Sequence, residues 1–158
     1  MRPAGRSIEA GLGSYGDGEY PGNYSVLKLG VSGTYVAAVL GSGYADAAAC
    51  AKYDGPNCQA SIHYSVRAVN ARARGWAEAP ISGASALAVS ASGAVAWVQP
   101  TISAGVSQLQ AILLRGGTGR LAVTEQLLDS GAIGASLRFS GLTLSWTNSG
   151  QPKSQRLR

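Results

Sequence analysis

The chain has 158 residues, of which 46% are hydrophobic and only 13% are charged, about half the usual ~25% charged share. This composition fits one domain with a hydrophobic core and excludes a disordered, highly charged chain. Thirteen basic and eight acidic residues give a net charge of +5. In the more basic second half of the chain the basic residues are scattered, except for Lys153, Arg156 and Arg158 in the tail, so we predict no nucleic-acid partner.

The chain begins with residues 1–24, a segment rich in glycine and tyrosine, and we predict a single domain over residues 25–158. A secretory leader would place an apolar stretch behind basic residues near the N-terminus. Here Arg2 and Arg6 are followed by Ser7 and Ile8 instead. No leader is visible, and we expect either that a leader has been removed or that export is not classical.

The domain contains an internal repeat of strand, Ser-Gly turn and strand. The three copies are residues 27–39, 87–98 and 137–147, with turn glycines Gly33, Gly93 and Gly141. Each copy joins two alternating apolar runs across a glycine, which is the pattern of a tight β-hairpin. When one residue of gap is allowed, Ala38, Trp97 and Trp146 occupy equivalent positions. The repeat predicts three similar hairpins.

A second repeat lies between these hairpins. Residues 61–69 resemble residues 107–115, and each run leads into a glycine- or asparagine-containing turn with arginine, the second being the predicted hairpin turn 116–120. A further short strand is predicted after each turn, near residues 76–79 and 121–128. Four short strands per ~50 residues is the period of a β-propeller blade. The predicted units are residues 25–80, 81–131 and 132–158.

Two stretches carry a resemblance to a known group of proteins. The stretch Ser-Gly-x-Val-Ala-Trp-Val (residues 92–98) is similar to the entry of a blade in the TolB- or WD40-like propellers of large secreted actinobacterial proteins, and residues 128–150 resemble the same repeats. The resemblance implies an all-β fold of about two and a half four-stranded propeller-like blades. It implies no particular activity, because propellers have many functions.

Two and a half blades are too few to close a propeller, which needs at least ~4. An open stack of blades exposes apolar faces and strand edges. The chain therefore belongs to a longer protein, or assembles with copies of itself, or folds into another closed form such as a β-sandwich. We expect a homo-oligomer or a complex with a parent or partner protein, and keep the β-sandwich as the alternative fold.

The two cysteines, Cys50 and Cys58, flank a polar loop that contains Gly55 and Pro56. Such a loop can turn back and bring the two sulfurs together, so we predict a disulfide, which implies an oxidising compartment. We therefore expect an extracellular or cell-surface location. Two cysteines do not complete a zinc site, and no metal is predicted. The charge-free residues 79–114 are interrupted by proline, glycine and glutamine, and no membrane span is predicted.

No residue pattern indicates catalysis. Asp17 and Glu19 are the closest carboxylates, but they stand in a glycine-rich stretch that does not fix their geometry. The only histidine, His63, lies within a predicted strand and is interpreted as a surface or hydrogen-bonded residue. No serine stands in a nucleophile elbow. We therefore predict a non-enzymatic protein with no cofactor.

Aromatic residues give the only indication of binding. All seven tyrosines lie at or before residue 64, and four stand in loops rich in glycine, aspartate or asparagine: Tyr15, Tyr20, Tyr44 and Tyr53. Tyrosines among small polar residues suit contact surfaces for protein or sugar. We interpret Trp76, Trp97 and Trp146 as core residues between blades. The sequence thus predicts a structural or interaction module of a secreted or cell-surface protein, and the alternative is a carbohydrate-binding module that uses the tyrosine loops.

Overall fold

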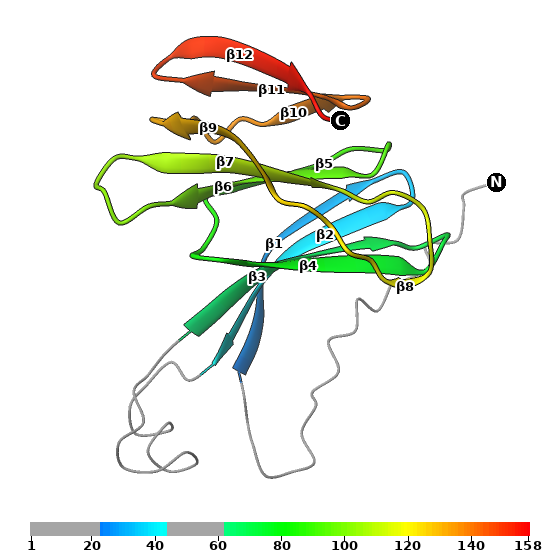
Figure 1. Ribbon diagram of the computed structural model, residues 1–158. Coiled ribbons are helices and arrows are strands. Elements are labelled where there is room, and N and C mark those ends of the chain that lie inside the picture. The colour runs from blue at the N-terminus through cyan, green and yellow to red at the C-terminus, as the bar shows by residue number, and fades with distance from the viewer. Residues whose placement is uncertain (1–22, 44–61) are drawn as a thin grey trace, which may run out of the picture.

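The computed structural model describes residues 23–43 and 62–158, and in this part of the chain it contains strands and no helix (Figure 1). The predicted all-β class is confirmed. The strands form three separate sheets, which we name A, B and C in chain order. Most strand pairs are antiparallel and join strands that follow one another in the chain, as expected for a sequence that alternates between apolar runs and glycine-containing turns.

Sheet A is five-stranded, with the order β1-β2-β3-β4-β8. Its strands are β1 (Asn23–Ser32), β2 (Tyr35–Gly43), β3 (Ile62–Asn70), β4 (Gly75–Ile81) and the two-residue β8 (Gly119–Arg120). The first four form an antiparallel meander, whereas β8 pairs with β4 in parallel.

Sheet B is a four-stranded antiparallel sheet and sheet C has three strands. Sheet B contains β5 (Ala86–Val89), β6 (Ala94–Pro100), β7 (Ser107–Leu113) and β9 (Gln126–Gly131). Sheet C contains β10 (Arg138–Ser140), β11 (Thr143–Asn148) and β12 (Gln151–Arg156). The hairpins β1–β2, β5–β6 and β10–β11 are those predicted around the three Ser-Gly turns.

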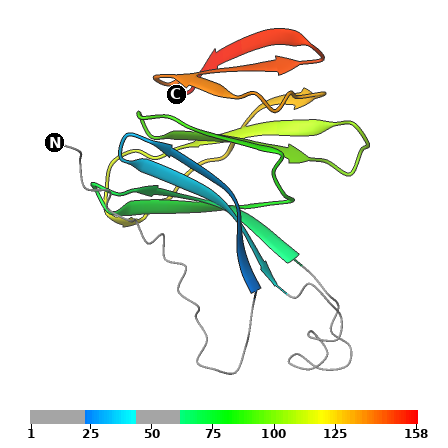
Figure 2. The ribbon, with the colours of Figure 1, turned by 180° about the vertical axis from the view of Figure 1, so that it is seen from behind.

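The three sheets are stacked, with sheet B between A and C, and both views show the three hairpin turns at the same end of the stack (Figures 1 and 2). Neighbouring turns touch, because a Cβ on Gly33 would lie 3.3 Å from that of Ala91, and the Ser90 hydroxyl donates a hydrogen bond to the Gly141 carbonyl oxygen. The first strands of the sheets also lie against one another, β1 against β5 and β5 against β10. The repeat in the sequence is thus a repeat in space.

Both inter-sheet cores join a tryptophan-bearing face to an alanine-rich face. Between A and B, Trp97 and Ile112 of sheet B pack against sheet A, whose buried face contains Ala37, Ala68, Ala77 and Ala79. Between B and C, Trp146 and Leu144 of sheet C pack against sheet B, which contributes Ala94, Ala96 and Ala111. Small residues on one face leave room for the indole of the next, which gives dense packing. Trp97 and Trp146 are therefore core residues, as predicted.

The connection between β7 and β9 differs from the expectation that residues 116–120 form a hairpin turn. It crosses to sheet A, where β8 extends the β4 edge through hydrogen bonds from the Gly119 amide to the Arg74 carbonyl and from the Leu121 amide to the Trp76 carbonyl. A Cβ on Gly75 would lie 2.5 Å from the Gly117 carbonyl oxygen, so this close approach requires glycine. The strand expected near residues 121–128 begins only at Gln126.

Candidate interaction surface

The stack has two end faces, the outer face of sheet A and the outer face of sheet C, each on the side away from sheet B. Side chains alternate along a strand, so each sheet places one set inside and the other outside. In sheet A, Ala37 and Val39 point towards sheet B. Ala38, which lies between them, points outwards, and so do its register partners on the neighbouring strands, Leu29 and Arg67. In sheet C, Leu144 and Trp146 point inwards.

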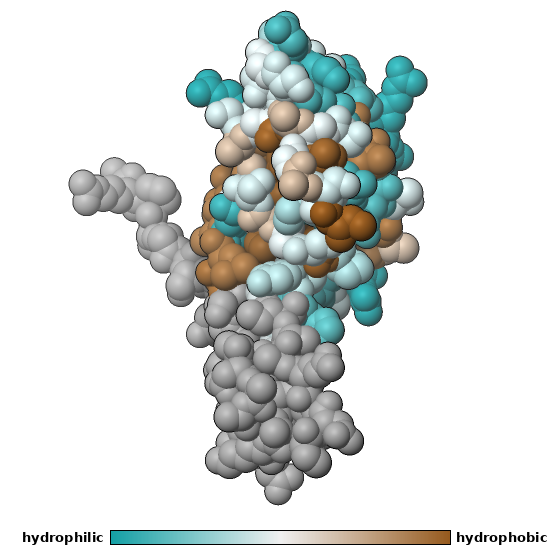
Figure 3. Space-filling view, turned by 90° about the vertical axis from the view of Figure 1, so that its left-hand side faces the viewer, coloured by the Kyte–Doolittle hydropathy of each residue, from teal (hydrophilic) through white to brown (hydrophobic). Residues whose placement is uncertain are grey.

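The outer face of sheet A is apolar and exposed on β1. Leu29 and Val31 are 62% and 63% exposed, and they pair across the strand with Ala38 and Val36 of β2, which are nearly buried. Val69 of β3 pairs with Val36 and continues the row. Of these five residues, Leu29 and Val31 form the exposed apolar surface, Val69 is partly exposed, and Val36 and Ala38 contribute almost no accessible area. Figure 3 shows hydrophobic residues gathered along the side of the molecule on which β1 lies.

Among the described residues, the β1 edge of sheet A has no neighbouring strand, and this edge is less suitable for binding a partner than the face of the sheet. The register between β1 and β2 shifts between Val26 and Lys28, which places a bulge at Leu27. A bulge twists the strand locally, and bulges and lysines are features that protect edge strands from pairing with other chains. Val26 and Leu27 are nevertheless 43% and 51% exposed, so the apolar surface continues along β1.

A charged cluster borders the apolar surface on β3 and β4. Trp76 lies between two guanidinium groups, with the Cζ of Arg67 at 5.4 Å and that of Arg120 at 5.5 Å from its ring centroid. Glu78 accepts hydrogen bonds from Arg67 Nη2 at 2.9 Å and from the Ser65 hydroxyl at 2.7 Å. Desolvation by burial raises the pKa of Glu78, but these hydrogen bonds and the two arginines lower it more, and the net shift is downward. The cluster is ionised at neutral pH.

Trp76 contradicts the expectation that all three tryptophans lie between sheets. It is partly exposed on the outer face, whereas Trp97 is fully buried and Trp146 is 5% exposed. The inner face of β4 is occupied by Ala77 and Ala79, so the alternation directs Trp76 outwards. The two arginines cover its ring and replace the missing inter-sheet contact.

The outer face of sheet C is polar. It carries six residues that lie opposite one another in the register of β10, β11 and β12: Arg138, Ser140, Thr143, Ser145, Ser154 and Arg156. All are exposed except Thr143, which is partly exposed. The end of the molecule formed by sheet C is accordingly mostly hydrophilic in Figure 3. This face has no exposed apolar row.

Asp129 of β9 joins sheets B and C. Its Oδ2 accepts hydrogen bonds from Trp146 Nε1 at 2.7 Å and Asn148 Nδ2 at 3.0 Å, and lies 3.1 Å from Lys153 Nζ. Burial raises the pKa of Asp129, but these donors and the Ser130 amide lower it further, to about 2. A cavity of about 370 Å³ opens beside this group. Because the carboxylate is already fully engaged by its own donors, the arrangement is structural.

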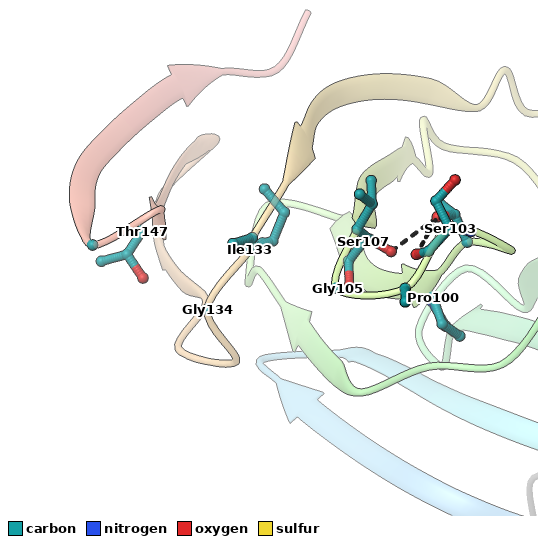
Figure 4. A pocket seen from close by; sticks show the side chains of 12 residues that line it. Pro100, Ser103, Gly105, Ser107, Ile133, Gly134 and Thr147 are labelled. Atoms are coloured by element: carbon teal, nitrogen blue, oxygen red, sulfur yellow. Dashed lines mark hydrogen bonds between the residues drawn. The ribbon is translucent and has the colours of Figure 1, made fainter.

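A second cavity, of about 440 Å³, lies where the β6–β7 turn approaches the connection that follows β9 (Figure 4). Its walls include Pro100, Ser103, Ser107, Ile133 and Thr147, and none of its lining residues has an acidic or basic side chain. The Thr101 hydroxyl is held by the Val106 carbonyl at 3.0 Å, within the turn. The cavity offers neutral hydroxyl and backbone groups only, so it provides no acid or base for catalysis.

Most residues that the sequence singled out lie outside the described residues. These are the tyrosines Tyr15, Tyr20, Tyr44 and Tyr53, the cysteines Cys50 and Cys58, and the carboxylates Asp17 and Glu19. The predicted disulfide and the carbohydrate-binding alternative therefore stay predictions. His63 is described, and it is exposed near the start of β3.

Residues 23–43 and 62–158 contain neither a candidate metal site nor a membrane-spanning helix. This part of the chain holds no group of three histidine, cysteine or acidic residues that could bind a metal ion. It has no helix long and apolar enough to cross a membrane. No protein-family model, curated protein or solved structure matches the chain.

Proposed function

We propose that this chain is a non-enzymatic interaction module of a secreted or cell-surface protein, built from propeller-like blades, which binds another protein surface through the outer face of sheet A. The observation that carries the proposal is the exposure of Leu29 and Val31, 62% and 63%, on an apolar face of an end sheet. Contiguous apolar patches with a polar border mark protein interaction sites on soluble proteins. The charged residues around Trp76 supply such a border.

The arrangement of the sheets supports the blade interpretation. The first strands β1, β5 and β10 lie side by side, and each tryptophan-bearing face packs on the alanine-rich face of the preceding sheet. Blades that radiate from a common axis place equivalent strands side by side and pack their sheets face to face. In such a series, the outer face of sheet A is equivalent to the faces of sheets B and C that carry Trp97 and Trp146. Each of those two faces is covered by the preceding sheet.

The experiment measures whether the outer face of sheet A is accessible and apolar in solution. A dye that fluoresces on exposed hydrophobic surface, such as ANS, should bind the purified protein when it is diluted far enough to be monomeric. The double substitution Leu29→Asp and Val31→Asp should remove dye binding without changing the circular dichroism spectrum, because both side chains are largely exposed.

The matched control is Ser145→Asp on the outer face of sheet C, which adds charge at an exposed polar position. It should leave dye binding unchanged. A monomeric wild-type protein that binds no dye would mean that the outer face of sheet A is covered within its own chain, and the proposed function would then be wrong.

A further inference from the structure

We infer that the partner of the outer face of sheet A is the same face of a second copy of this chain, so that two stacks join about a two-fold axis with their sheets C at the far ends. The inference rests on the proposed function and names its partner. Three features support this pairing: the side chains on the two end faces, the irregular edge of β1, and the charges beside the apolar row.

Head-to-tail assembly is unfavourable at both surfaces that it would join. Inside the stack, each inter-sheet contact needs a tryptophan on one face and an alanine-rich surface on the other. The outer face of sheet A has Ala38 at the position equivalent to Trp97 and Trp146. The outer face of sheet C presents Arg138 and Arg156, whose burial without partners would be costly.

Strand addition at the free edge of β1 is also unfavourable. The bulge at Leu27 interrupts the ladder between Val26 and Lys28, so a partner strand would meet an irregular and twisted edge. The exposed side chains of Leu29 and Val31 lie on the face of the sheet and would stay in water after edge pairing. Only contact on the face covers them.

The outer face of sheet A can meet a copy of itself without opposing charges of one sign at its centre. The central row is apolar, with Val31 next to Val36 and Leu29 next to Ala38. The nearest charges, Arg67 and Glu78, neutralise one another at 2.9 Å, and Arg120 lies over Trp76 at the β4 side of the face, away from the central row. Isologous contact places like surface on like surface, and a neutral apolar centre is what such contact requires.

The face has the area of a small interface. Four strands about 4.8 Å apart, with about seven residues each at ~3.3 Å per residue, give a flat area of roughly 19 by 23 Å. This is about 440 Å², roughly half of the ~800 Å² per partner of a standard interface, which is the size range of weaker pairings. A closed two-fold pair would cover both apolar faces at once and leave polar sheet C faces towards water.

Light scattering coupled to size exclusion, over a series of protein concentrations, tests the pairing. The wild-type chain should have the mass of two copies. The variant with Leu29→Asp and Val31→Asp should be a monomer, with a dissociation constant raised on the order of 100-fold or more, because like charges would face one another across the two-fold axis. The single substitution Val31→Asp is the second variant, with a smaller shift in the same direction.

Ser145→Asp is again the matched control, and it should leave the dimer intact. A dimer that survives the double substitution, or one that Ser145→Asp dissociates, would overturn the inference. Larger open assemblies of the wild-type chain would also overturn it, in favour of head-to-tail contact. A monomer whose outer face of sheet A binds ANS would reject the second copy as partner and leave the proposed function standing, whereas a monomer that binds no dye would reject both.

Discussion

The two end faces of the stack are built on similar antiparallel sheets but differ in the side chains that they present. The outer face of sheet A exposes Leu29 and Val31, whereas the outer face of sheet C exposes serines and two arginines. The strands themselves therefore do not decide whether a sheet can stack further, because main-chain pairing is alike in both. The side chains on alternate positions decide it, and in this molecule they favour stacking at one end only.

The outer face of sheet A also differs from the equivalent faces of sheets B and C, which are buried. Trp97 and Trp146 are covered by the preceding sheet, and at the equivalent position sheet A has Ala38. Because sheet A has alanine at this position, its outer face stays apolar but has no protruding indole. Such a face can meet a flat partner, which a face with a central tryptophan cannot do as readily.

The largest loss of stability is expected when a buried indole is removed, and removal of a partly exposed indole should cost much less. Trp97→Ala should lower the free energy of unfolding by about 3–5 kcal/mol, because it leaves a cavity between sheets A and B. Trp76→Ala, on the outer face, should lower it by about 1 kcal/mol, the order of an exposed cation–π contact. Denaturant unfolding measures both. Equal losses would mean that Trp76 is as much a core residue as Trp97.

A smaller effect is expected at Asp129, which attaches the polar end sheet to the rest of the stack. Asp129→Asn should lower the free energy of unfolding at pH 7 by about 1.5–3 kcal/mol, the range for hydrogen bonds to a charged group. The pKa of Asp129 is about 2 in the folded chain, below its ordinary value of 3.8. Its stabilisation is therefore present above pH 3.8 and is lost as the pH falls through about 2.

Unfolding followed between pH 7 and pH 2 checks this prediction. The difference in stability between the wild-type chain and the Asn variant should be constant near neutral pH and should shrink below about pH 4, where the unfolded carboxylate begins to bind a proton. A difference that does not change with pH would show that the charge of Asp129 contributes nothing and that only the shape of the side chain matters.

The sequence predicts the local parts of this fold and fails at contacts between distant segments. The three hairpins were predictable because Gly33, Gly93 and Gly141 adopt positive φ angles at turns flanked by alternating apolar runs. The crossing of residues 116–120 to sheet A was not, because β8 contains only two residues and pairs with a strand more than forty residues earlier. A short parallel pairing of this kind has no local pattern.

The candidate surface could have been predicted in part. Glu78 stands two residues after Trp76 and therefore on the same face of β4, and this carboxylate indicates an outer face. The alternation in β1 and β2 shows two apolar faces, but which of them is covered depends on the stacking of whole sheets. The Asp129 group combines residues of β9, β11 and β12, and no spacing in the sequence brings these together.

The difference between the two end faces can also be removed by design. Replacing polar residues of the outer face of sheet C with apolar ones, as in Arg138→Leu with Ser145→Leu, should create a second surface capable of stacking. With both ends apolar, the chain should form larger and open assemblies, visible as a concentration-dependent increase of mass in light scattering. A mass unchanged from that of the wild-type chain would show that the polar side chains of sheet C do not limit assembly.

The smallest effect is expected from Trp97→Phe. The indole Nε1 of Trp97 is buried without a hydrogen-bond partner, so its replacement removes a polar group that receives no compensation inside the stack. The smaller ring also loses some packing against the alanine-rich face of sheet A, and the two effects oppose one another. Stability in denaturant should change by less than about 1.5 kcal/mol, the usual limit for similar apolar replacements. A loss as large as that of Trp97→Ala would mean that the Nε1 hydrogen has a partner in solution and that the contact between sheets A and B depends on it.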